Sequence, residues 1–222
     1  MPVSAPKTAD DRNGPGAAPA RRPAGRRTQA ERRDQSIRST IAAAIEIIGE
    51  SGVAAATFET IGARAGYSRG LASAHFGSKQ GLIEAVLHDL DDQSAVEVFN
   101  RRLIGLSGLP ALLGYIDAAF AAARTTRARA YFTLLAANLA ETDPHHALFA
   151  QTHRRKLDWL AEQIAAGQAA GEIRPGIDPE GGALLVATIV VGLAMQLMVD
   201  PATRIETLHQ TALATLRSAF AA

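Results

Sequence analysis

The 222-residue sequence contains no cysteine, which excludes disulfides, thiolate metal sites and cysteine nucleophiles. Its first residues lack an apolar run and do not resemble a secretory signal, so we expect a cytoplasmic protein. No glycine-rich phosphate loop follows a strand pattern, and no nucleophile, base and carboxylate are visibly grouped. The sequence therefore gives no positive support for an enzyme or for a bound cofactor.

A large net charge is also missing, because the chain carries only +1 at neutral pH. The charge is unevenly distributed. Residues 1–33 hold eight basic and three acidic residues, and the remainder holds 15 basic and 19 acidic residues. A simple electrostatic argument for nucleic-acid binding thus applies only to the first segment. With 47% hydrophobic and 20% charged residues, the rest is expected to fold around a substantial core.

The segment 1–33 is rich in Pro, Ala, Gly and Arg and shows no apolar periodicity, which predicts disorder. Two interpretations remain open. The segment is a solubilising leader, or it is an arm that lies along DNA and contacts phosphates or the minor groove. The arm's candidate contacts are Arg26, Arg27, Arg32 and Arg33.

Residues 57–76 predict two short helices joined by a turn. Thr57 is suited to cap the first helix, and Gly66 is suited to end it because glycine readily adopts positive φ. Ser68 can cap the second helix, which leaves a connection of about three residues, as helix-turn-helix units use. A preceding helix is expected from about Asp34 to Glu50, and a following one from Ser78 toward Asn100.

From Gly66 onward the chain reads GYSRGLASAHFGSKQGLIEAVL. This segment closely resembles the signature of TetR-family transcriptional regulators, in which a Gly-x-Ser turn precedes a short recognition helix. The family's aromatic, small, Ser and Lys continuation is present as Phe76-Gly77-Ser78-Lys79. By motif the resemblance spans roughly residues 37–87, and beyond that it rests on length and helical character.

Three positions depart from the family pattern. Gly62 stands where Ala is usual, and Tyr67 replaces a small branched residue in the turn. Ser73-Ala74 stands where an aromatic often precedes the His-Phe pair, which puts one family DNA contact in doubt.

The resemblance implies double-stranded DNA as a partner, read by the second short helix. Arg69 is the candidate for a guanine edge, with a phosphate contact or an idle surface charge as the alternatives. His75 is equally consistent with a packed surface histidine. Lys79 is the residue that the family uses on phosphate. The full set of candidate DNA contacts is Thr57, Tyr67, Ser68, Arg69, Gly70, Ser73, His75 and Lys79.

The remaining sequence predicts further helices at about 110–123, 127–142, 145–170, 179–199 and 203–220, without useful strand alternation. We therefore expect an all-α protein of about nine helices. A three-helix DNA-binding domain would span 34–80, and an effector-binding and dimerisation domain 81–222.

Residues 182–199 form an almost wholly apolar run of about 18 residues, which touches the lower length of a membrane span. A core or subunit-interface helix is the favoured interpretation, since Gln196 interrupts the run and no basic anchors flank it. The resemblance implies that the last two helices pair across a twofold axis. The candidate homodimer contacts are Leu185, Ile189, Leu193, Leu208 and Leu216.

The resemblance also places an effector cavity among the middle helices, although aromatic residues at such spacings more often belong to a plain core. The candidates for lining it are Tyr131, Phe132, Asn138, Phe149 and Trp159. His145, His146 and His153 lack the four-residue step that would place two imidazoles on one helical face, so no metal is expected.

The leading interpretation is a homodimeric repressor that binds a near-palindromic operator and responds to a small-molecule effector. One rival is a nucleoid-coating or architectural protein that uses the basic segment and little sequence. A second rival is an all-helical enzyme whose first helices only resemble a DNA reader.

Overall fold

The computed structural model describes residues 28–94, 103–139 and 144–222. Within these ranges the regular structure is helical, apart from one isolated antiparallel bridge between Ile173 and Ala221. The elements are α1 (Gln29–Ser51), η1 (Val53–Ala55), α2 (Phe58–Ala65), α3 (Arg69–Phe76), α4 (Lys79–Ser94), α5 (Gly108–Ala122), α6 (Thr126–Ala137), α7 (His146–Ala169), α8 (Pro179–Val199) and α9 (Ile205–Phe220). The predicted all-α class with about nine helices is confirmed.

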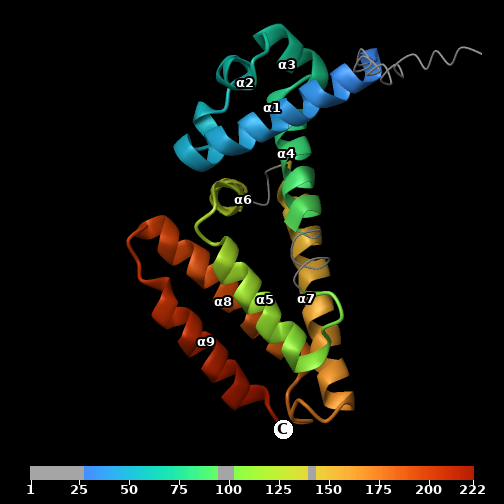
Figure 1. Ribbon diagram of the computed structural model, residues 1–222, viewed down its shortest axis with the longest axis vertical. Coiled ribbons are helices and arrows are strands. Elements are labelled where there is room, and N and C mark those ends of the chain that lie inside the picture. The colour runs from blue at the N-terminus through green and yellow to red at the C-terminus, as the bar shows by residue number, and fades with distance from the viewer. Residues whose placement is uncertain (1–27, 95–102, 140–143) are drawn as a thin grey trace, which may run out of the picture.

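The helices form two parts, a head that comprises α1, α2 and α3 and a body that comprises α5, α7, α8 and α9. In Figure 1, α1, α2 and α3 lie at one end of the molecule, and α5, α8 and α9 lie at the other. The helices α4 and α7 run along the long axis, and α6 crosses beneath the head (Figure 1).

The first helix starts earlier than predicted. Its N-terminus is capped reciprocally: the Thr28 hydroxyl accepts a hydrogen bond from the Glu31 amide, and the Glu31 carboxylate accepts one from the Thr28 amide. The predicted start at Asp34 was therefore wrong, and so was disorder up to residue 33. Arg32 and Arg33 are exposed on α1, whereas Arg26 and Arg27 lie outside the described residues.

The head has a core that extends beyond its own helices. Ile45 and Ile48 of α1 pack with Ile61 of α2. Ala130 and Leu134 of α6 are fully buried in the same cluster. The core of the head therefore includes part of the segment predicted to be the effector domain.

The body encloses a second core between α5, α7, α8 and α9. Leu193 and Leu216 are only 2% exposed within this core, so neither lies on the surface of the single chain. Their prediction as subunit contacts was therefore wrong. Leu185 and Leu208 are 49% and 38% exposed, and Ile189 is half-buried. The apolar helix α8 is long enough to span a membrane by length and composition, yet one of its faces lies in this core.

Head and body are joined by close contacts of α6. A Cβ atom at Gly49 of α1 would lie 2.5 Å from the backbone oxygen of Thr126 and 2.7 Å from its Cγ2. Next to it, the Arg127 guanidinium donates to the Asp89 carboxylate at 2.6 Å and to the Asp89 carbonyl at 3.1 Å. These contacts tie α1 and α4 to the start of α6.

Because the backbone oxygen of Thr126 and its short β-branched side chain both face Gly49, the substitution Gly49→Ala is expected to separate α1 from α6. We predict a loss of about 1–3 kcal/mol of unfolding free energy, as for other overpacked sites, measured by urea denaturation. Gly70→Ala is the matched control, since its new Cβ would meet only Ser68 Oγ, at 3.9 Å. Equal stability of the two variants would contradict a tight α1–α6 contact.

Candidate nucleic-acid interface

The helix α2 begins at a capped and exposed N-terminus. The Thr57 hydroxyl accepts a hydrogen bond from the Thr60 amide at 3.2 Å, and the Thr60 hydroxyl accepts one from the Thr57 amide at 3.0 Å. The Thr60 hydroxyl also donates to the Ala55 carbonyl at 2.7 Å. The predicted cap at Thr57 is confirmed, and the positive end of the α2 dipole faces solvent.

The turn between α2 and α3 depends on two glycines. Gly66 ends α2 in the left-handed region with φ +77°, and the Tyr67 amide then donates to the Gly62 carbonyl at 2.8 Å. A Cβ at Gly62 would lie 3.0 Å from the Tyr67 carbonyl oxygen and 3.2 Å from the Arg69 amide nitrogen. Glycine at position 62, which departs from the family pattern, therefore permits a close approach of α3 to α2.

The helix α3 presents its first turn to solvent. Ser68 caps it by accepting a hydrogen bond from the Leu71 amide at 3.2 Å, as predicted. Ser68, Arg69 and Gly70 are exposed, whereas Tyr67 and Ser73 are half-buried. Within the turn and α3, the exposed candidates are thus those at the N-terminal end of the helix.

Three candidate contacts that are distant in sequence share one groove. Thr57, Arg69 and Lys79 line a hollow of about 330 Å³ between the start of α2, the start of α3 and the start of α4. The ammonium of Lys79 donates to the Val53 carbonyl at 2.9 Å, which fixes it beside the N-terminus of α2. Two cations and a helix N-terminus converge there, and Glu59 is the one acid in the lining. This combination suits a phosphate group.

His75 points the other way. Its Nε2 lies 2.7 Å from the Ser36 hydroxyl of α1, and that hydroxyl is 2.8 Å from the Arg33 carbonyl. Because the carbonyl can only accept, the Ser36 proton goes to it, and His75 Nε2 must donate to Ser36. We assign His75 to packing between α3 and α1 and do not include it in the interface.

The predicted effector residues do not gather around one cavity. Tyr131 contacts Phe132 and Phe149 edge-on, with ring centroids 5.2 and 5.9 Å apart. Trp159 lies 5.9 Å from the Tyr115 ring. Asn138 is buried and donates to the Leu134 carbonyl at the end of α6, which is a helix-ending role. Phe132 alone of the five lines the pocket between α6 and α8.

A lysine that sequence analysis missed lies within the aromatic cluster. The Lys156 ammonium is 4.7 Å from the Tyr131 ring centroid and 3.5 Å from its hydroxyl. Burial opposes the charge of Lys156, but the nearby oxygens of Tyr131, Tyr115 and Asp91 outweigh it and raise the pKa of Lys156. Burial also raises the pKa of Tyr115. A lone lysine on a polar helix face gave no sequence signal of this placement.

The histidines of the α7 region do not assemble a metal site. His145 precedes α7, and its Nε2 lies 3.2 Å from the Gln80 carbonyl of α4. Among the residues that the structure describes, no group of three or more His, Asp or Glu side chains is positioned to hold an ion.

The architecture defines a class of protein. Two short capped helices joined by a glycine turn, with serine and arginine exposed at the start of the second, constitute a helix-turn-helix DNA-binding unit. Comparison with known proteins makes the class specific. The profile of the family "Bacterial regulatory proteins, tetR family" matches residues 41–86, and that of the BetI-type transcriptional repressor C-terminal domain matches residues 110–221. The chain belongs to the TetR family of bacterial transcriptional regulators.

Individual relatives are similar over different lengths. The HTH-type transcriptional regulator BetI of Escherichia coli O139:H28 is 44% identical over 69 residues, which cover 30% of this chain and 35% of that regulator. The chain thus matches about a third of the length of this curated relative.

Solved structures agree over most of the chain. A TetR regulator from Chloroflexus aurantiacus superposes with a TM-score of 0.75 at 20% identity, covering 86% of this chain and 98% of that one. A transcriptional regulator from Saccharomonospora viridis in complex with choline superposes with a TM-score of 0.72 at 16% identity, covering 85% of this chain and 99% of that one. The SmeT–triclosan complex superposes with a TM-score of 0.68 at 23% identity, covering 84% of this chain and 92% of that one. At these identities the superpositions establish the shared fold.

Membership in this family makes the protein a DNA-binding regulator, and the enzyme alternative is set aside.

The assignment of His75 to packing predicts the effect of His75→Ala. Losing its hydrogen bond to Ser36 is expected to cost about 1 kcal/mol of unfolding free energy. DNA affinity, measured by fluorescence anisotropy on the fully folded variant, is expected to stay within about twofold of the unchanged protein, because Nε2 faces α1. A tenfold loss of affinity without a loss of stability would place His75 back among the DNA contacts.

Proposed function

We propose that this regulator is a homodimeric repressor that binds a near-palindromic operator through α3 and is released by a small-molecule effector. The groove shared by Thr57, Arg69 and Lys79 is the observation that carries the proposal. Access to chromosomal DNA places the protein in the cytoplasm on this account, with no membrane partner.

The exposed residues divide into base and phosphate contacts. Arg69 begins α3 and makes no ion pair among the described residues, so its guanidinium is available to grip a guanine edge with two hydrogen bonds. Lys79, held by the Val53 carbonyl, and Thr57, at the α2 N-terminus, are positioned for phosphates. Ser68 and Gly70 supply a polar and sterically open surface next to Arg69.

A second copy of the chain is the proposed partner of α8 and α9. Leu184, Leu185 and Val199 of α8 are exposed, as is Leu208 of α9. A row of large apolar residues on a helix surface is typical of a subunit interface. We therefore retain Leu185 and Leu208 as contacts and add Leu184, while Leu193 and Leu216 support the same helices from within.

The body is the proposed effector domain. Relatives of this fold are recorded in complexes with choline and with triclosan. A twofold dimer positions its reading helices roughly 34–36 Å apart, one turn of DNA. An effector that binds better to a state with a different separation lowers operator affinity.

The architectural alternative depends on the basic N-terminal segment, of which Arg26 and Arg27 lie outside the described residues. Footprinting separates the two functions, since a short symmetric protected site is expected of the repressor and diffuse protection of an architectural protein.

Arg69→Ala and Lys79→Ala test the interface. Arg69→Ala is expected to cost about 1–3 kcal/mol of binding free energy and to relax base preference at one position. Lys79→Ala is expected to weaken all duplexes similarly and to reduce the salt dependence by about one counterion. Binding would be measured by anisotropy over a salt series on duplexes selected from a random pool. The control is Arg154→Ala, an exposed α7 arginine remote from the groove. Unchanged binding by both variants would reject the interface.

Leu185→Glu tests the dimer. A carboxylate on the exposed face of α8 is expected to convert a particle of about 47 kDa, twice the chain mass of 23.3 kDa, into a monomer, measured by light scattering. Leu139→Glu, which alters another exposed leucine after α6, is expected to leave the dimer intact. A monomeric unchanged protein, or a dimeric Leu185→Glu variant, would contradict the proposed interface.

A further inference from the structure

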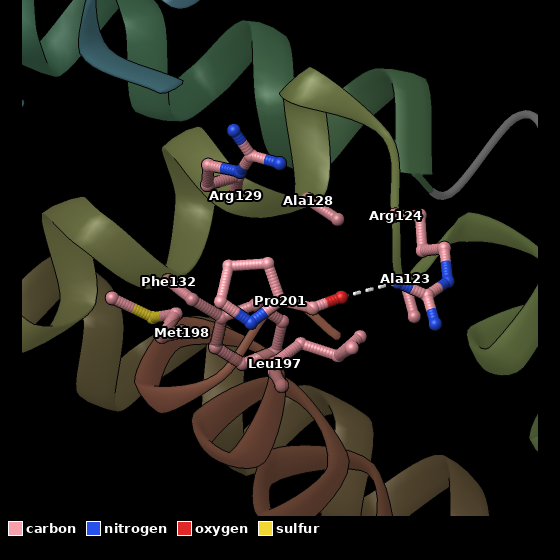
Figure 2. Close-up of a pocket in the computed structure, with 9 residues that line it drawn as sticks. Ala123, Arg124, Ala128, Arg129, Phe132, Leu197, Met198 and Pro201 are labelled. Atoms are coloured by element: carbon pink, nitrogen blue, oxygen red, sulfur yellow. Dashed lines mark hydrogen bonds between the residues drawn. The ribbon is translucent and has the colours of Figure 1, made fainter. Parts of the chain in front are cut away.

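A pocket of about 290 Å³ lies between the start of α6 and the end of α8. Its apolar lining includes Phe132 of α6 and Leu197 and Met198 of α8, and Pro201 closes it beyond α8. Figure 2 shows Ala128 and Arg129 on the α6 side of this pocket and Leu197 and Pro201 across from them. The volume is at the lower end of the range for small-molecule sites.

The polar groups of the pocket are both arginines. Arg124 donates to the Pro201 carbonyl (Figure 2) and to the Thr203 carbonyl, each at 2.8 Å, which ties the α8–α9 connection to the turn before α6. Neutral carbonyls leave its charge uncompensated. Arg129 is exposed, and within the described part of the chain its guanidinium makes no hydrogen bond or ion pair. No carboxylate belongs to the lining, so the pocket favours an anion over a cation.

From this geometry we propose that the α6–α8 pocket binds an amphipathic carboxylate. The carboxylate pairs with the guanidinium of Arg129, for which a planar bidentate partner is the preferred geometry. The apolar part of the ligand packs against Phe132, Leu197 and Met198.

The position of the pocket gives such a ligand a route to the DNA-binding head. Ala128, Arg129 and Phe132 fall on one face of α6, because residues three or four apart share a helical face. Ala130 and Leu134 fall on the opposite face and are buried in the core of the head. Thr126, at the start of the same helix, is in close contact with Gly49 of α1. A ligand that displaces α6 from α8 therefore changes the packing of α1. This regulatory consequence rests on the proposed function, whereas binding of the carboxylate does not.

The test uses the full chain and a matched set of probes: 4-phenylbutyrate, 4-phenylbutylamine and the neutral 4-phenylbutanol, titrated calorimetrically at pH 7. The acid is expected to bind at least tenfold more tightly than the amine. Arg129→Gln is expected to weaken the acid about tenfold and to leave the alcohol unchanged. Phe132→Ala is expected to weaken both. Arg154→Gln, which removes an exposed cation outside the pocket, is expected to alter neither.

Two results would overturn the site. One is equal affinity for acid and amine. The other is an acid affinity that survives Arg129→Gln but is lost in Lys156→Gln, which would place the anion at the Tyr131 cluster.

Operator affinity of the ligand-free protein is measured separately. Intact operator binding without acid selectivity rejects the pocket alone, and selective acid binding without any operator binding rejects the proposed function alone.

Discussion

The close packing of α1 on α6 is the contact on which the rest of this structure depends. Gly49 allows the two backbones to meet at Thr126, and Arg127 holds α4 beside them through Asp89. Ala130 and Leu134 of α6 complete the core of the head, so the head shares its core with α6 and cannot rotate independently of it. In the proposed dimer, the body would then set the separation of the two α3 helices.

The parts of the interface that sequence predicted are those with local causes. Thr57 and Ser68 cap their helices through amides only three residues away, and Gly66 ends α2 by a single backbone conformation. The start of α1 also has a local cause that the sequence contains, because Thr28 and Glu31 form a capping box. The basic composition of the surrounding segment obscured it, and the predicted helix began too late.

The features that sequence missed are long-range contacts. The bond from His75 to Ser36 spans 39 positions, and nothing near His75 indicates that its ring faces α1. Leu193 and Leu216 belong to an apolar pattern that is suited to a core or to an interface, and only the packing of α8 and α9 decides between the two. Four of the five predicted effector residues are aromatic, which suits a core as well as a cavity, and Phe132 alone of the five lines the α6–α8 pocket.

The central claim is that a rigid junction fixes the spacing of two symmetric reading helices. Its most direct measurement compares affinity for a selected palindromic duplex with affinity for the same duplex carrying five extra central base pairs, about half a turn of DNA. A rigid dimer is expected to lose at least tenfold in affinity, because one half-site then faces away. Equal affinity for the two duplexes would contradict this account.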